Sequence, residues 1–175
     1  MSETSNSQAI VGVIMGSDSD LDIMCEAPKM LEQFGVPYEV RIISAHRTPD
    51  AMADYAQTAS RRGLQVIIAG AGGSAHLPGM TASETDLPVI AVPVKRDHHD
   101  HEALWSNIKM PGGIPLATMP ENGAKNAALL AVRILALNDP ELATKYAEFR
   151  QGLHDGVLAI DKQVQTDGWK AHLEK

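Results

Sequence analysis

The sequence alternates between short apolar runs and longer segments with helical spacing, and this alternation restricts the folds that it can adopt. Apolar runs rich in Val and Ile predict strands at 9–15, 36–43, 64–69, 88–94 and 114–118. Apolar residues three or four positions apart predict helices at 20–34, 49–62, 75–83, 101–110 and 122–137. Strands that alternate with helices form parallel sheets with right-handed crossovers. We therefore predict an α/β fold: a three-layer parallel sheet, flavodoxin- or Rossmann-like, with a C-terminal helix.

The length of 175 residues fits one domain with a full hydrophobic core. We predict a disordered N-terminus at 1–8 and a single α/β catalytic domain at 9–175. That domain should end in a helical extension from Pro140 to about Gln165.

Two of the predicted helices carry features that the structure can test. Pro28 should kink the helix at 20–34, because an interior proline removes a helical hydrogen bond, and Gly35 is suited to end it. The Ala-rich apolar face of 122–137 is wide enough for burial on two sides. Such a face belongs either in an oligomer core or inside one subunit.

The charge balance excludes several classes of partner. Fifteen basic and twenty-two acidic residues give a net charge of −7, which disfavours nonspecific binding to nucleic acid or to anionic membrane surfaces. No apolar run approaches the roughly twenty residues of a membrane span. The single cysteine, Cys25, excludes an intramolecular disulfide, and the polar start of the chain lacks the pattern of a signal peptide. We therefore expect a cytoplasmic protein that captures an anionic ligand through local features.

The segment Ser44-Ala45-His46-Arg47-Thr48-Pro49 places chemistry directly after a predicted strand. Thr48 is suited to cap the next helix and Pro49 to its first position. Open α/β sheets bind ligands at such turns. Histidine titrates near neutral pH, and arginine offers a planar cation to phosphate. The pair indicates an enzyme for a phosphorylated small molecule; the alternative is a surface His and Arg at a helix start.

Two further turns follow predicted strands. The strand at 64–69 runs into a segment with three glycines in four residues, and His76 lies just beyond them. Glycines permit a backbone to approach a ligand closely or to take positive φ. The strand at 9–15 ends in Gly16-Ser17-Asp18-Ser19-Asp20, where amides and hydroxyls before a helix suit a phosphate. Parallel strands bring all of these turns to one edge of the sheet.

The segments 16–20, 44–49 and 69–80 resemble the three signatures of the carboxyaminoimidazole ribonucleotide mutase family, the catalytic subunit of bacterial phosphoribosylaminoimidazole carboxylase. The resemblance extends from about Ile10 to Leu137. It implies an isomerase of de novo purine (IMP) biosynthesis, which moves a carboxylate from the exocyclic amine to a ring carbon of aminoimidazole ribonucleotide. It also implies a phosphorylated imidazole ribotide as substrate, no metal or organic cofactor, and a homo-octamer.

The resemblance assigns roles to individual residues. His46 is implied as the general acid/base, and His76 lines the same pocket. Ser17 and Arg47 are implied as phosphate ligands and Asp20 as a sugar ligand. The remaining implied substrate-binding residues are Ser44, which orients His46 or contacts the carboxylate, and Gly70, Gly72, Gly73, Ser74, Ala75 and Leu77 of the glycine-rich turn. Two alternatives stay open: His76 as a structural histidine bonded to a carbonyl, and Asp20 as a helix N-cap.

The segments 95–101 and 119–123 depart from the family pattern, because they lack the usual Gln-Ser start, Gly-x-Asp-Ser segment and Ala-Ile-Gly. The stretch 103–113 is nearer to the related carboxylases, which use carbon dioxide directly. The alternatives to the mutase are therefore such a carboxylase, or a paralogue that acts on another imidazole ribotide. A noncatalytic nucleotide-binding or response-regulator-like module ranks third, since it would need no paired histidines beside a glycine-rich turn.

The run Asp97-His98-His99-Asp100-His101 contains metal-ligating residue types. Neighbouring ligands in one loop rarely close a tetrahedral site without partners from elsewhere in the chain. We therefore expect a solvated loop near the site and no bound metal.

Overall fold

The computed structural model describes residues 8–96 and 101–173, and its contacts divide the chain into two compact units between Leu135 and Ala136. The second unit contains the predicted C-terminal helical extension, while one catalytic domain over 9–175 stays a prediction. Of the N-terminal residues expected to be disordered, only Gln8 is described, and its side-chain amide donates a hydrogen bond to the carbonyl of Arg62.

The first unit is built on a five-stranded sheet in the order β2-β1-β3-β4-β5, and every neighbouring pair is parallel. The strands are β1 (Val11–Met15), β2 (Tyr38–Ile42), β3 (Val66–Gly72), β4 (Val89–Val94) and β5 (Ala117–Thr118). The predicted parallel sheet of the flavodoxin type is confirmed. Strands β1, β3 and β4 are buried almost throughout, because helices cover both faces of the sheet.

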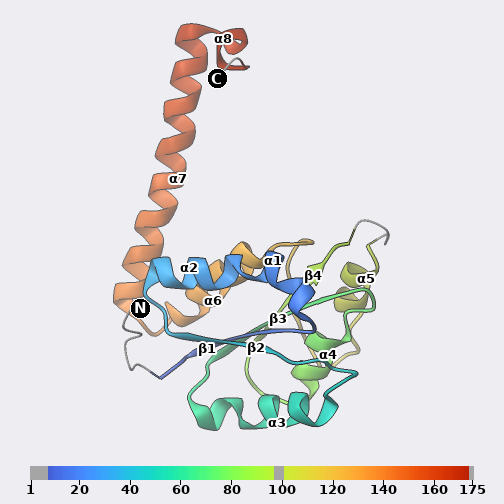
Figure 1. Cartoon of the computed structure of the whole chain (residues 1–175). Coiled ribbons are helices and arrows are strands. Elements are labelled where there is room, and N and C mark those ends of the chain that lie inside the picture. The colour runs from blue at the N-terminus through green and yellow to red at the C-terminus, as the bar shows by residue number, and fades with distance from the viewer. Residues whose placement is uncertain (1–7, 97–100, 174–175) are drawn as a thin grey trace. The chain divides into compact units, whose positions relative to one another are not determined.

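The helices of the first unit form two layers around this sheet (Figure 1). One layer consists of α1 (Leu21–Met24), α2 (Glu26–Phe34) and α6 (Ala124–Leu135). The other consists of α3 (Pro49–Ala59), α4 (His76–Ser83) and α5 (Glu102–Ile108). Two short 3₁₀ turns, η1 (Asp18–Asp20) and η2 (Ser60–Arg62), complete the unit. The second unit holds α7 (Pro140–Asp167), which was predicted, and α8 (Trp169–Leu173), which was not.

The predicted helix at 20–34 differs from the observed structure at Pro28. The helix breaks at Cys25, three residues before the proline, so Pro28 occupies the third position of α2. The first backbone amides of a helix have no intrahelical acceptor, and a proline there removes no hydrogen bond. The predicted kink at Pro28 is therefore wrong in position, while Gly35 ends α2 with φ of +69° as expected.

The wide apolar face of α6 is buried inside the first unit. Its buried side chains are Ala124, Ala127, Ala128, Ala131, Val132 and Leu135. Helix α6 contacts α2 on one side and strands β3 and β4 on the other, so short side chains are needed in both directions. Burial within one subunit, the second of the two alternatives, accounts for the pattern.

Gly12 in β1 faces the ring of Tyr55 on α3. A Cβ added at Gly12 would lie 2.2 Å from the Tyr55 hydroxyl and 3.2 Å from a methyl group of Leu64. Tyr55 is buried, and this burial raises the pKa of its phenol. The glycine is therefore required by close packing between the sheet and α3, not by its backbone angles.

We predict that Gly12→Ala lowers the free energy of unfolding by about 1–3 kcal/mol, because the extra methyl overfills the space beside the rigid Tyr55 ring. Urea unfolding followed by circular dichroism measures the change. Gly152→Ala in α7 is the matched control, since nothing lies within 4 Å of a Cβ there and alanine favours the helix. Adding Tyr55→Phe should recover part of the loss; full stability of Gly12→Ala alone would contradict the packing argument.

Candidate active site

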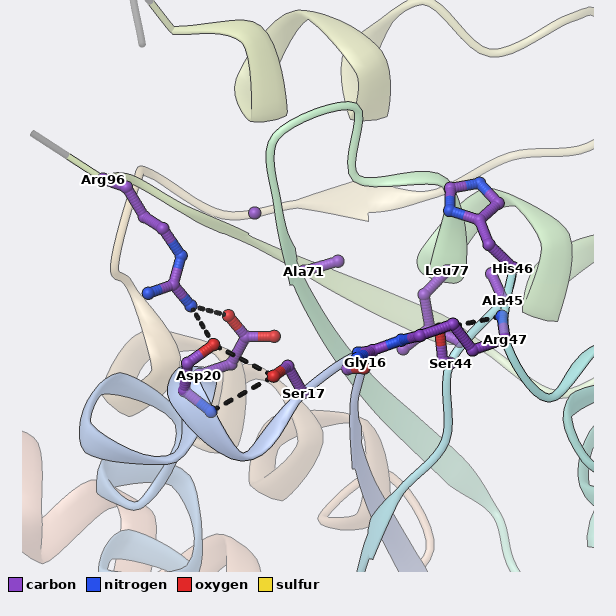
Figure 2. Close-up of a pocket in the computed structure, with 12 residues that line it drawn as sticks. Gly16, Ser17, Asp20, Ser44, Ala45, His46, Arg47, Ala71, Leu77 and Arg96 are labelled. Carbon is purple, nitrogen blue, oxygen red and sulfur yellow. Dashed lines mark hydrogen bonds and ion pairs between the residues drawn. The ribbon is translucent and has the colours of Figure 1, made fainter. Parts of the chain in front are cut away.

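A pocket of about 330 Å³ lies at the edge of the sheet where β1, β3 and β4 end (Figure 2). This edge is the ligand-binding edge of open α/β folds. The lining residues come from the turns after β1 and β2, from the end of β3, from α4 and from the residues that follow β4: Gly16, Ser17, Ser19, Asp20, Ser44, Ala45, His46, Arg47, Ala71, Gly72, Leu77 and Arg96. The three turns singled out in the sequence therefore meet in one pocket.

His46 and His76 are in direct contact. Nε2 of His46 lies 2.8 Å from Nδ1 of His76, and the two rings are perpendicular with centroids 4.9 Å apart. One of these two nitrogens must carry the proton that the other accepts. His46 lines the pocket, and His76 supports its ring from the first position of α4. The alternative of a carbonyl partner for His76 is wrong for Nδ1, because the partner of that atom is the His46 ring.

Arg47 is held against the pocket by two neighbouring turns. Its Nη2 donates to the carbonyl of Gly16 at 2.8 Å, and its Nε donates to the hydroxyl of Ser44 at 3.3 Å. The Ser44 hydroxyl also accepts from the Arg47 backbone amide at 3.2 Å. Ser44 therefore orients Arg47, whereas the sequence suggested that it orients His46 or contacts the substrate carboxylate.

Thr48 takes the N-cap position of α3, and Pro49 follows at the first helical position as predicted. The side chain of Thr48 does not cap the helix, however. Its hydroxyl donates to the carbonyl of Ser44 and accepts from the Ser44 amide, both at 3.0 Å. The predicted capping bond is thus replaced by two hydrogen bonds between Thr48 and Ser44, which close the turn that carries His46 and Arg47.

The turn after β1 contains several hydrogen bonds between neighbouring residues. The Ser17 hydroxyl donates to the Asp18 carboxylate at 3.0 Å and accepts from the Ser19 hydroxyl at 3.0 Å. The hydroxyl of Ser17 and the amide of Ser19 hold the pKa of Asp18 below its usual value. Ser17 also caps η1, so its side chain is anchored at the pocket wall by local structure.

Asp20 and Arg96 form an ion pair that the sequence-based site did not include. Asp20 is 3% exposed, its side chain makes no capping bond to α1, and its Oδ1 accepts from Nη2 of Arg96. Asp20 occupies the N-cap position of α1 as the alternative expected, but its side chain does not form the capping bond. Arg96 could have been found from its position two residues after a buried strand, at the edge where the three turns meet.

The glycine-rich turn contributes less side-chain surface to the pocket than the resemblance implied. Gly72 and Leu77 line it, whereas Gly70, Gly73, Ser74 and Ala75 are not among its lining residues. A Cβ on Gly70 would lie 2.2 Å from the sulfur of Met24, so this glycine makes room for α1. Gly73 and Ala75 have φ of +61° and +41°, which gives the turn its tight path into α4.

The His-rich run at 97–101 is described only at His101, and residues 97–100 lie outside the described structure. Nδ1 of His101 lies 2.8 Å from the Glu121 carboxylate, which Lys95 also approaches at 3.7 Å. Within residues 8–96 and 101–173, no three side chains of the metal-ligating types come together. No helix in the same residues is long and apolar enough to cross a membrane.

Comparison with known proteins identifies the family. The family model described as AIR carboxylase matches residues 10–156, which include every element of the first unit and every residue that lines the pocket. The chain belongs to the AIR carboxylase family. The predicted resemblance is confirmed by this match.

Similar proteins extend the comparison over most of the chain. The N5-carboxyaminoimidazole ribonucleotide mutase of Thermotoga maritima is 51% identical over 94% of this chain and 97% of that protein. The phosphoribosylaminoimidazole carboxylase of Saccharomyces cerevisiae is 52% identical over 94% of this chain, but the match spans only 29% of that protein. The crystal structure of Treponema denticola PurE superposes with a TM-score of 0.80 at 30% identity, over 88% of this chain and 97% of that one.

Proposed function

We propose that this protein is an N5-carboxyaminoimidazole ribonucleotide mutase of de novo purine biosynthesis. The proposal rests above all on the contact between His46 and His76 at the end of a pocket that also holds two arginines. A proton-transfer group beside fixed cations suits a reaction on an anionic ribotide. Mutase relatives that match this chain along almost their entire length support the same assignment.

The reaction moves a carboxyl group within one molecule. The bond between the exocyclic nitrogen and the carboxyl carbon breaks, and the nitrogen receives a proton while carbon dioxide is released into the pocket. The ring carbon then attacks the carbon dioxide, and the proton on that carbon must leave. One imidazole that first donates a proton to the exocyclic nitrogen and then accepts a proton from the ring carbon balances the two steps. No metal or organic cofactor enters either step.

His46 is the proposed proton carrier, and His76 is the group that holds the His46 ring in place. The Nε2–Nδ1 contact of 2.8 Å fixes the orientation of the His46 ring, which donates its proton to the exocyclic nitrogen in the first step and accepts one from the ring carbon in the second. Arg47 and Ser17 are the proposed phosphate ligands, since both line the pocket beside Gly16. Asp20 is the proposed acceptor for the sugar hydroxyls.

His46→Asn should keep the fold and the binding of the ribotide but lower kcat by at least the 10²–10⁴-fold that a general acid–base group typically contributes. Asparagine keeps a polar group of similar size and cannot carry the proton. Steady-state kinetics and isothermal calorimetry separate kcat from binding. A His46→Asn enzyme within a few-fold of wild-type kcat would remove His46 from the chemistry.

A carboxylase that takes carbon dioxide from bulk solution is the main competing function, since the segments 95–101 and 119–123 depart from the family pattern. The histidine pair supports the mutase more strongly than these loops support the carboxylase, because loops vary more freely than catalytic groups. The purified protein should convert the carbamate to the carboxylate at low bicarbonate faster than it carboxylates the bare aminoimidazole ribotide.

The test supplies each ribotide separately under matched bicarbonate and follows the product by ultraviolet absorbance. Preference for the bare ribotide would assign the carboxylase reaction. Inactivity on both, with the fold intact, would favour a paralogue that acts on another imidazole ribotide.

The proposed assembly is the homo-octamer of the family, in the cytoplasm. Helix α7 carries Leu153, Val157, Ile160 and Val164 at spacings of four, three and four residues, which is one helical stripe. The first three are 57%, 67% and 51% exposed in the single chain. An exposed apolar stripe of this length is typical of an interface between subunits.

Light scattering should therefore give a mass eight times the 18.8 kDa of one chain. Val157→Glu should shift the protein to smaller species, because it places a charge in the stripe. Lys162→Glu, which changes a residue of α7 away from the stripe, is the control and should keep the large assembly. A monomeric wild type would contradict the proposal.

A further inference from the structure

Arg96 connects the end of β4 to the turn after β1. Its Nη2 donates to the Ser19 hydroxyl at 2.8 Å and to Oδ1 of Asp20. A Cβ on Gly72 would lie 3.3 Å from Nε of Arg96 and 3.1 Å from the Val94 carbonyl. The missing side chain of Gly72 therefore leaves room for the guanidinium, so the glycine-rich turn and the arginine fit each other.

The partner of Arg96 is a carboxylate with little access to water. The Asp20 side chain is 4% exposed, while that of Arg96 is 43% exposed. Removing a carboxylate from water is costly unless a cation or several donors compensate it. Arg96 supplies the positive charge, and the second oxygen of Asp20 faces Gly16, 3.7 Å from where a Cβ there would be.

The pair determines the charge of the pocket. Among the lining residues, Asp20 is the acidic side chain, and Arg47 and Arg96 are the two arginines. With Arg96 present, one positive charge remains after Asp20 is compensated; without it, Asp20 and Arg47 cancel. This difference matters because the chain as a whole carries −7 and repels anions.

We infer that Arg96 is a specificity-determining residue of the pocket: by compensating Asp20, it allows a phosphorylated ribotide to be preferred over the corresponding nucleoside. The inference rests on the proposed function and adds a residue to it. Arg47 and Arg96 approach the pocket from different strands, and Figure 2 shows Arg96 and Asp20 at one end with His46 at the other. Arg96 is therefore positioned to set the charge around the sugar and phosphate without touching the histidine pair.

The experiment compares the dissociation constants of aminoimidazole ribonucleotide and of its dephosphorylated nucleoside by calorimetry at low ionic strength. The ratio of nucleoside to nucleotide constants measures the benefit of the phosphate. Arg96→Ser should lower this ratio about tenfold or more, in the range of a lost charge-assisted contact, with a smaller effect on the nucleoside alone. Arg96→Lys keeps the charge without the planar fork and should lie between Arg96→Ser and wild type.

A double variant separates charge compensation from a structural role. Asp20→Asn added to Arg96→Ser removes the uncompensated carboxylate, leaves Arg47 with the net charge of +1 that the wild type has, and should return the ratio to within about threefold of the wild type. Arg61→Ser, the same change at an exposed arginine of η2, is the control and should keep the wild-type ratio. Arg47→Ala removes the other guanidinium. Its ratio shows how far the loss of a proposed direct phosphate ligand lowers the preference for the nucleotide.

The outcomes distinguish the inference from the proposed function. If the wild type prefers the nucleotide and both Arg96 variants keep its ratio, the inference is wrong and the proposed function stands. Equal weakening of both ligands by Arg96→Ser, with no recovery in the double variant, would make Arg96 merely structural and also overturn the inference. If the wild type does not prefer the nucleotide, the proposed function fails and the inference fails with it.

Discussion

The hydrogen-bonded alignment of the parallel strands is the constraint on which the site depends. Met15 of β1 lies beside Ile42 of β2 and Gly70 of β3, and Gly72 lies beside Val94 of β4. Because parallel neighbours end in the same direction, the segments that follow them must begin at one edge. Residues separated by as many as 80 positions thus line a single pocket, and a change of register in any strand would separate them.

Within that alignment, charge compensation governs the details of the pocket. Asp20 and Arg47 come from different turns, and each is tied to a neighbouring segment, Asp20 to Arg96 and Arg47 to the Gly16 carbonyl. Each of these contacts links two strand ends, so the groups that we propose to bind the ligand also hold the edge of the sheet together. A pocket built in this way can bind an anion in a protein of net charge −7, because local cations act over shorter distances than the distributed acidic residues.

The sequence predicted the fold well because its signals were local. Alternating strands and helices, Pro49 at a helix start and Gly35 at a helix end are all determined by neighbouring residues, and the structure agrees with them. Thr48 was expected to cap a helix through its side chain, and the same role was an alternative for Asp20, but both side chains bond to other partners in the folded turns. Gly70 was read as a ligand-binding glycine, while its distant neighbour Met24 explains it by packing.

The sequence by itself thus determined the order of strands and helices, the turns whose residues meet in the pocket, and the pairing of His46 with a glycine-rich segment. Tertiary structure alone decided which atoms meet: that His46 and His76 share a hydrogen bond, that Ser44 orients Arg47, and that Arg96 compensates Asp20. The physical reason is that secondary structure follows from interactions over a few residues. Contacts across the pocket depend on strand order and register, which the whole packed sheet sets.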